Sequence, residues 1–341
     1  MFTTNQMKRS LIKKVRDKIV RKTTGGKMLV GNYNIKLDRN HNLSSVLERY
    51  PDYGSNLVRL AKYIDTKYKN LKIFDIGGNI GDTVAMLLSG NPNYEIMSIE
   101  GNEKYFKILT ENFGTNKSVK LCKKFLGETN ETIIASEIKQ EGTLKLDTSI
   151  TAKASETAII TLDSLIARNP DFKGAKLLKI DTDGFDNKII RGSKDYLTKT
   201  KPAIYFEYDS QSAEENKLNP LNIFIFLEEH GYKDAAFFDN YGRFILSTTL
   251  RDKKILNQLS RYTGNQMGSF AFYDIVVFHE QDSDIAESFK KNNPKKTTEK
   301  HPILEESQKE PSAIEISRQE IDSLSKHAQK ALLDRIDNAR K

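Results

Sequence analysis

The chain has 341 residues, enough for one large domain with appendages, and its formal net charge at pH 7 is +8. Its one cysteine, Cys122, excludes an intramolecular disulfide and a zinc site built from cysteines. No stretch approaches the roughly 18 consecutive apolar residues of a membrane-spanning helix, and the first residues lack the apolar core of a secretory signal. We therefore expect a cytoplasmic protein.

The net charge lies in a basic arm, residues 1–27. These residues hold nine of the 54 Lys and Arg but only one of the 46 Asp and Glu, so the rest of the chain is neutral overall. Leu11, Val15 and Ile19 recur at helical spacing, which predicts a basic amphipathic helix over 7–22. The helix either contacts an anionic membrane at its inner face or packs on the folded domain. A nucleic-acid-binding domain usually carries its positive charge on the folded body, so we expect no nucleic acid as a partner.

Residues 28–70 are predicted to form a cap that precedes the main domain. The run 28–37 alternates like a short hairpin, and residues 44–65 supply helical segments that break near Pro51 and Gly54. His41 lies in the loop between these parts. It is a candidate general base, because a histidine can take up a proton near neutral pH, and a solvated loop residue is the alternative.

Residues 71–280 alternate between strand-like and helical runs. We expect strands in LKIFDI, YEIMSIE, SVKLCKKFL, KLLKID and PAIYFEY, and helices over 82–90, 103–113, 186–197 and 220–230. AAFFD and FILSTT flank DNYG as a hairpin, FYDIVVFH closes the domain, and residues 128–160 form an insertion with β-like pieces that the sequence does not resolve. The alternation predicts an α/β fold with a mostly parallel sheet, helices on both faces and an antiparallel last strand.

The composition changes after residue 280. Residues 281–316 are rich in Lys, Glu, Ser and Pro and are predicted to form a flexible linker. Ser317 and Glu320 offer a capping box before apolar positions at helical spacing, which predicts an amphipathic helix over 317–341. A docking or coiled-coil role and packing on the same chain both remain open for this helix.

The stretch FDIGGNIGDT, residues 74–83, follows the first strand of the main domain. In an α/β sheet such a turn places backbone amides and a helix N-terminus beside a nucleotide-like ligand. Its spacing, D-x-G-x-x-x-G, differs from the dinucleotide fingerprint G-x-G-x-x-G, which disfavours NAD. The carboxylate of Asp75 suits S-adenosylmethionine (SAM), which carries a cationic sulfonium and amino group and no phosphate.

A second acid, Glu100, ends the next strand, where its side chain can accept hydrogen bonds from both ribose hydroxyls. The two acids at two strand ends make the SAM prediction more specific than either alone. The residues predicted to bind SAM are Asp75, Gly77, Gly78, Asn79, Gly81, Asp82, Thr83, Glu100, Gly101, Asn102 and Asp181.

These motifs, with SIEGN, TLDSL, LLKIDTDGFDNKIIRG and KPAIYFEYD, resemble the FkbM family of SAM-dependent methyltransferases over about residues 71–210. NHNLSSVLERYPDYGSNL before the sheet is also similar to the family. This chain has Gly78 where Ala is common, and Asp183 and Asp186 where Glu is common. The resemblance implies a Rossmann-like class I methyltransferase sheet and transfer of a methyl group to a hydroxyl, often on a sugar of a polysaccharide, lipopolysaccharide, glycolipid or secondary metabolite.

Methyl transfer to a hydroxyl needs a group that removes the hydroxyl proton or a metal that holds the oxygen. Asp181 and Asp183 follow the strand KLLKI, and Glu207 lies near the end of PAIYFEY, so we expect these carboxylates at one crevice. They can bind Mg²⁺, but we favour catalysis without a metal, because no second acid stands beside Glu207 in its strand and Asp183 is short. Asp181 then orients the methionine part of SAM and Asp183 caps the next helix. The predicted catalytic residues are Asp181, Asp183, Glu207 and His41.

Two other functions remain to be weighed against a sugar O-methyltransferase. Retention of Asp75, Glu100, Asp181 and Glu207 argues against a non-catalytic SAM-binding or scaffold protein. The acidic run KIDTDGFD argues against a nucleic-acid methyltransferase, in which an N-P-P-Y-like run is often found after the fourth strand. The sequence identifies neither the acceptor sugar, nor the hydroxyl, nor the oligomeric state.

Overall fold

The computed structural model describes residues 26–38, 41–140, 143–147, 155–182, 184–210, 219–264 and 272–293, all within the compact unit Met1–Ile303. The helices predicted over 7–22 and 317–341 lie outside these ranges. So does Asp183, one of the predicted catalytic residues.

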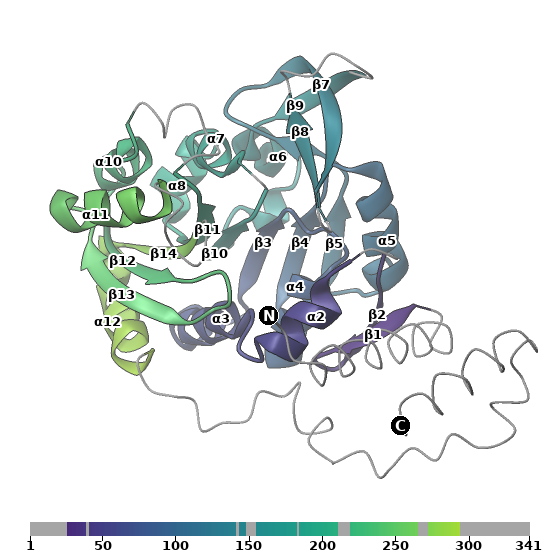
Figure 1. The fold of residues 1–341 in the computed structure, drawn as a ribbon, viewed down its shortest axis with the longest axis horizontal. Helices are drawn as coiled ribbons and strands as arrows, with labels where there is room; N and C mark the ends of the chain where they lie inside the picture. The colour runs from purple at the N-terminus through teal and green to yellow at the C-terminus, as the bar shows by residue number, and fades with distance from the viewer. Residues whose placement is uncertain are drawn as a thin grey trace, which may run out of the picture. The chain divides into compact units, whose positions relative to one another are not determined.

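An eight-stranded sheet forms the centre of the described part, in the order β13–β12–β14–β11–β10–β3–β4–β5 (Figure 1). Five neighbouring strands are parallel: β3 (Lys72–Ile76), β4 (Glu95–Ile99), β5 (Val119–Cys122), β10 (Leu177–Ile180) and β11 (Ala203–Tyr208). Three form the antiparallel side: β12 (Tyr232–Phe238), β13 (Phe244–Thr249) and β14 (Tyr273–His279). The predicted Rossmann-like sheet with an antiparallel last strand is thus confirmed.

The strand order reverses between β3 and β10. From β3 the chain builds outward through β4 and β5, whereas β10 leads to β11 on the other side. Ligands of open α/β sheets bind beyond the carboxyl ends of the strands at such a point. The fold therefore places the candidate site where β3 and β10 end.

Helices cover both faces of the sheet. Their bounds are α2 (Leu43–Arg49), α3 (Ser55–Lys67), α4 (Asp82–Gly90), α5 (Glu103–Phe113), α6 (Leu162–Ala167), α7 (Asp186–Arg191), α8 (Lys194–Thr200), α10 (Asn222–Glu229), α11 (Lys253–Gly264) and α12 (Ser283–Asn292). The central strands are buried on both faces, which is why they read as continuous apolar runs in the sequence.

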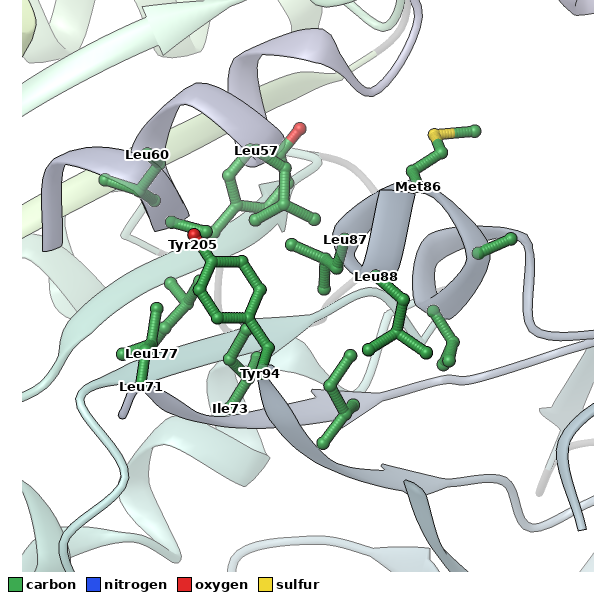
Figure 2. Close-up of a cluster of buried hydrophobic side chains, with 14 of the residues drawn as sticks. Leu57, Leu60, Leu71, Ile73, Met86, Leu87, Leu88, Tyr94, Leu177 and Tyr205 are labelled. Carbon is green, nitrogen blue, oxygen red and sulfur yellow. The ribbon is translucent and has the colours of Figure 1, made fainter. Parts of the chain in front are cut away.

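The cap shares the core of the main domain. Its hairpin pairs β1 (Lys27–Val30) with β2 (Tyr33–Lys36), and Gly54, at φ 73°, separates the helices α2 and α3. Figure 2 shows the apolar cluster on this face of the sheet, with side chains from α3, α4 and the strands below them: Leu57, Leu60, Leu71, Ile73, Met86, Leu87, Leu88, Tyr94, Leu177 and Tyr205. The cap thereby becomes a wall above the carboxyl edge of the sheet.

The insertion over residues 128–160 forms most of a second, four-stranded sheet, in the order β6–β9–β7–β8. Its strands are β6 (Phe125–Leu126), β7 (Glu131–Gln140), β8 (Thr143–Asp147) and β9 (Ser155–Ile160). The strand predicted over 118–126 is accordingly divided between β5 of the large sheet and β6 of the small one.

Three expectations about elements were wrong or incomplete. The helix predicted over 186–197 is interrupted at Gly192 and Ser193, which separate α7 from α8. Gly192 packs closely at this point: an added Cβ would lie 2.1 Å from the carbonyl oxygen of Gly127. The predicted linker does not begin at residue 281: α12 follows, and it buries Ile285 and Phe289 against the core. Helix α11 was not predicted, although it buries Leu256.

Candidate active site

One face of the large sheet carries two rows of polar residues. The inner row consists of residues that lie opposite one another in register on four neighbouring strands: Ser98, Asp75, Lys179 and Tyr205. The outer row lies two residues further along these strands and continues onto β14: Glu100, Gly77, Asp181, Glu207 and Asp274. Side chains alternate between faces along a strand, so both rows face the cap.

The inner row is a buried charge network. Lys179 is 3% exposed, and its Nζ lies 3.2 Å from Oδ1 of Asp75 and 3.6 Å from Oδ2 of Asp181. Ser98 donates a hydrogen bond of 2.8 Å to Oδ2 of Asp75. Burial favours the neutral amine of Lys179, but the charges of Asp75 and Asp181 outweigh it and raise the pKa of Lys179. Lys179 also donates to the carbonyl oxygen of Gly77, at 3.2 Å, which ties the network to the glycine loop.

The contacts of Asp75 differ from those expected of a residue that binds the SAM cation. Its carboxylate is fully buried and already paired with Lys179 and Ser98. It is not one of the described residues that line the cavity above the loop. Its carboxylate is thus engaged within the protein, through Lys179, which also donates to the loop carbonyl of Gly77.

The glycines of the loop are required by contacts within the protein. The amides of Gly77 and Gly78 both donate to the carbonyl oxygen of Ile99, at 2.9 Å, and Gly81 donates to Gly78 at 2.8 Å. An added Cβ would come within 2.7 Å of other atoms at each position: Asp181 O for Gly77 (1.8 Å), Ser98 Oγ for Gly78 (2.2 Å) and Phe113 for Gly81 (2.7 Å). These amides are therefore already paired within the protein, and the sheet and helix α5 fill the space beside the glycines. Contact of the loop with the ligand stays a prediction.

Glu100 is held in place at the end of β4. Its Oε2 accepts the amide of Asn79 at 2.9 Å, and its Oε1 accepts the amide of Asn102 at 2.8 Å. Burial raises the pKa of Glu100. Each carboxylate oxygen can accept a further hydrogen bond, so Glu100 is fixed in a position to accept from two neighbouring hydroxyls. Asn102 itself caps α5 by accepting the amides of Lys104 and Tyr105, which gives it a structural role.

A cavity of about 620 Å³ lies over the outer row, below the cap. This volume is within the range of pockets that hold small molecules. It brings together these predicted site residues: His41, Gly77, Asn79, Asp82, Thr83, Glu100, Gly101, Asp181 and Glu207. Asp75, Gly78, Gly81 and Asn102, although described, are not part of its lining. These four residues lie outside the cavity and contribute to the structure around the loop and the start of α5.

His41 is buried in the cavity wall, and its contacts argue against a role as a base. Its Nδ1 accepts the amide of Leu43 at 3.2 Å. In a neutral imidazole the other nitrogen, Nε2, then carries the proton and can only donate. His41 is 8% exposed, and Nε2 has no partner among the described residues. His41 is thus placed to donate a hydrogen bond to a ligand.

Sequence reasoning missed the acid of β14. Asp274 lies directly opposite Glu207 in the antiparallel pair of β11 and β14 and lines the same cavity. Burial raises the pKa of Asp274 to about 7, against a hydrogen bond from Tyr205 that lowers it. Tyr53 of the cap also faces this group, and burial, with the nearby charges of Asp82 and Asp181, raises its pKa.

The carboxylates of the cavity are also the candidate metal ligands. Within the described ranges, no group of three or more His, Cys, Asp or Glu side chains is placed to hold a metal ion. Asp183, which the Mg²⁺ alternative required, lies outside those ranges.

The residues present fit SAM as a ligand. Glu100 is preorganised for two hydroxyls, and the buried Nε2 of His41 is available to a polar group. Burial raises the pKa of Asp82 at the start of α4. The cavity is therefore lined by polar groups and carboxylates, and its volume is within the range of pockets that hold small molecules.

Comparisons with known proteins point the same way. Residues 75–233 match the sequence model described as the methyltransferase FkbM domain, and no curated protein matches the chain. Similar solved structures include the methyltransferase FkbM from Methylobacillus flagellatus KT, at 15% identity and a TM-score of 0.34, with 49% of this chain and 40% of that chain covered.

Two further structures are similar. One is the precorrin-6y C5,15-methyltransferase from Geobacter metallireducens GS-15, at 15% identity and a TM-score of 0.32, covering 64% of this chain and 86% of that chain. The other is the plantazolicin methyltransferase BpumL, solved with SAH, at 12% identity and a TM-score of 0.36, covering 70% and 89%. Structural similarity at these identities and TM-scores does not support any conclusion about function. The identification rests on the sequence model and the motifs: residues 75–233 match the methyltransferase FkbM domain, which supports a SAM-dependent methyltransferase.

Proposed function

We propose that this protein is a SAM-dependent O-methyltransferase that methylates a sugar hydroxyl during the synthesis of a polysaccharide, lipopolysaccharide or other glycan. One observation carries the proposal. A single cavity joins Glu100, held for a ribose, to the facing carboxylates of Glu207 and Asp274. It thus contains both a site for a nucleoside donor and a group of acids that can activate a hydroxyl.

The donor half lies over β3 and β4. Glu100 would accept hydrogen bonds from the ribose hydroxyls, and Asp82, Thr83 and Gly101 would line the rest of the donor. SAM supplies a methyl group on a positively charged sulfur. Asp181 is half-exposed at the end of β10, where its carboxylate can orient the cationic amino group of the donor.

The acceptor half lies over β11 and β14. Three strand spacings separate Glu100 from Glu207, or about 14 Å, which leaves room for the donor between them. The walls there are aromatic and polar: Arg49, Tyr50, Tyr53, Tyr205, Asn240 and Tyr241. The rings of Tyr50 and Tyr241 stack with centroids 3.4 Å apart. Tyrosine, amide and guanidinium groups offer both flat apolar surface and hydrogen bonds, the combination that a sugar requires.

The function is tested by supplying methyl-labelled SAM with oligosaccharides, nucleotide sugars, RNA and DNA as separate acceptors. We expect label in a sugar-containing acceptor, as a methyl ether that survives mild base. The carboxylates of the outer row should repel a phosphate backbone, so RNA and DNA should remain unlabelled. Label confined to nucleic acid, or no transfer to any sugar, would refute the proposal.

Replacing Glu100 by alanine should weaken SAM binding by about 10- to 100-fold, since two hydrogen bonds to the ribose are lost. The matched control is Glu95→Ala. Glu95 begins the same strand, where its half-exposed carboxylate pairs with Lys72, away from the cavity. Calorimetry should give Glu95→Ala the wild-type affinity. Equal affinities for both variants would remove Glu100 from the donor site.

The basic arm, of which residues 1–25 lie outside the described ranges and Lys27 begins β1, is proposed to contact the inner face of an anionic membrane from the cytoplasm. No helix of the described part is long and apolar enough to cross a membrane. Deleting residues 1–26 should leave turnover on a dissolved acceptor unchanged and reduce binding to anionic vesicles at low salt, because the arm carries the net charge. Cosedimentation with vesicles checks this, and unchanged binding would refute the membrane contact.

A further inference from the structure

We propose that Asp274 is the group that removes the proton of the acceptor hydroxyl, and that Tyr205 and Asn56 hold its carboxylate in position. The proposal rests on the proposed function, because it assigns the activating group of that same site. It goes beyond the sequence motifs, none of which includes β14.

The sheet places Asp274 at the acceptor end of the cavity. It lies opposite Glu207 across the pair of β11 and β14, with Cβ atoms roughly 5 Å apart in such pairs. Both line the cavity together with Asp181 on the next strand. An acceptor hydroxyl that faces a donor over β3 and β10 thus has Asp274 on its far side.

A short chain of buried hydrogen bonds orients the hydroxyl of Tyr205 beside the carboxylate. Asn56 of α3 is fully buried, and its Oδ1 accepts the amide of Leu57 at 2.9 Å, which sets the orientation of its amide group. Its Nδ2 donates to the hydroxyl oxygen of Tyr205 at 3.1 Å. Tyr205, 7% exposed, lies on the same face of the sheet as Asp274, and its hydroxyl lowers the pKa of that carboxyl. Because its oxygen accepts from Asn56, its own proton can be directed to Asp274. Elements from the cap and two strands therefore hold one carboxylate.

Two other candidate bases, Asp181 and His41, are less suited. Asp181 is half-exposed, and its Oδ2 lies 3.6 Å from the ammonium of Lys179, so its carboxylate already has a partner. His41 accepts the amide of Leu43 at Nδ1, so in a neutral imidazole its Nε2 is a donor and cannot take up a proton. Asp274 lies in a partly buried, acidic environment that raises its proton affinity. A base is most effective when its pKa lies near the working pH.

The charged and titratable groups that face Asp274 come from four elements. Neighbouring carboxylates raise its pKa further, whereas Lys179 and the hydroxyl of Tyr205 lower it. These groups are Tyr205 and Glu207 of β11, Lys179 and Asp181 at the end of β10, Asp239 after β12, and Tyr53 of the cap.

In the proposed step Asp274 accepts the proton of the acceptor hydroxyl while the acceptor oxygen forms a bond to the donor methyl carbon. The oxygen displaces the sulfur, which keeps the electron pair of the broken carbon–sulfur bond and loses its positive charge. The products are a methyl ether, a neutral thioether and the carboxylic acid of Asp274, which returns its proton to water. No metal or further reactant is needed for this balance.

The test compares Asp274→Asn, Tyr205→Phe and a control, Asp284→Asn, whose exposed carboxylate pairs with Lys67 at the start of α12. Asp274→Asn should lower kcat by 10²- to 10⁴-fold with SAM affinity unchanged within about twofold. Tyr205→Phe removes a hydrogen bond that lowers the pKa of Asp274 and should move the acidic limb of the pH profile of kcat to higher pH. Asp284→Asn should match wild type. A kcat within threefold of wild type for a folded Asp274→Asn would overturn the proposal.

A second measurement separates this proposal from the proposed function. In the protein without substrates, ¹³C NMR of the aspartate carboxyls should show two resonances that titrate near pH 7, because burial also raises the pKa of Asp186 to about 7. The resonance of Asp274 is the one that is lost in Asp274→Asn and moves to higher pH in Tyr205→Phe, while that of Asp186 remains. Titration of the Asp274 resonance in the ordinary range of aspartate would overturn the assignment of Asp274 even if sugars are methylated. Failure of every sugar acceptor, with this titration present, would instead refute the proposed acceptor.

Discussion

Replacing Gly77 by alanine should lower the free energy of unfolding by about 4 kcal/mol or more, or prevent folding altogether. The added Cβ would lie 1.8 Å from the carbonyl oxygen of Asp181, and backbone atoms cannot give way without breaking the pairing of β3 and β10. Gly77 also has φ 80°, a conformation that costs a residue with a Cβ of order 1 kcal/mol or more. Urea unfolding measures the effect.

The matched control for this substitution is Gly174→Ala. Nothing lies within 4 Å of a Cβ added at Gly174, and its φ is outside the left-handed region. The control should change stability by no more than about 0.5 kcal/mol. A Gly77→Ala protein with the unfolding midpoint of the control would contradict the packing described for the loop. Because Gly77 supports the fold, loss of SAM binding in its variants would not identify the donor site.

Replacing Lys179 by methionine should destabilise the domain by about 3–5 kcal/mol, since it leaves the buried carboxylate of Asp75 without its cation. The double variant Lys179→Met with Asp75→Asn should recover much of this loss, because the uncompensated charge is removed. Thermal and urea unfolding of the two variants measure both effects.

An exposed ion pair provides the comparison for Lys179. Lys199 pairs with Asp195 one helical turn away, and their side chains are 73% and 70% exposed. Lys199→Met should change stability by no more than about 0.5 kcal/mol. If Lys179→Met were as mild as Lys199→Met, or if Asp75→Asn failed to rescue it, the inner row would not be the charge network inferred here.

Local patterns in the sequence predicted the parts of the fold that depend on short-range chemistry. Apolar runs buried on both faces predicted the parallel strands, and the acid at the end of YEIMSIE predicted Glu100 at the cavity. Helix α12 was missed because its three buried residues, Ile285, Ala286 and Phe289, are spread over a highly charged stretch. Composition alone therefore described this segment as a linker.

The residues that sequence reasoning misplaced depend on pairing between distant strands. Asp274 faces Glu207 only because β14 inserts between β11 and β12 in one particular register, which no local pattern encodes. Asp75 was predicted to meet a ligand because its true partner, Lys179, is supplied by β10, about a hundred residues later in the chain. That Asp75 pairs with Lys179 within the protein became clear only once the order of the strands was known.

A crystal structure of the protein with S-adenosylhomocysteine tests the central claim most directly. We expect the ribose hydroxyls within hydrogen-bond distance of Glu100, and the sulfur directed along the outer row toward Glu207 and Asp274. A nucleoside bound outside this cavity, or one inside it whose ribose does not contact Glu100, would contradict the assignment of the donor site.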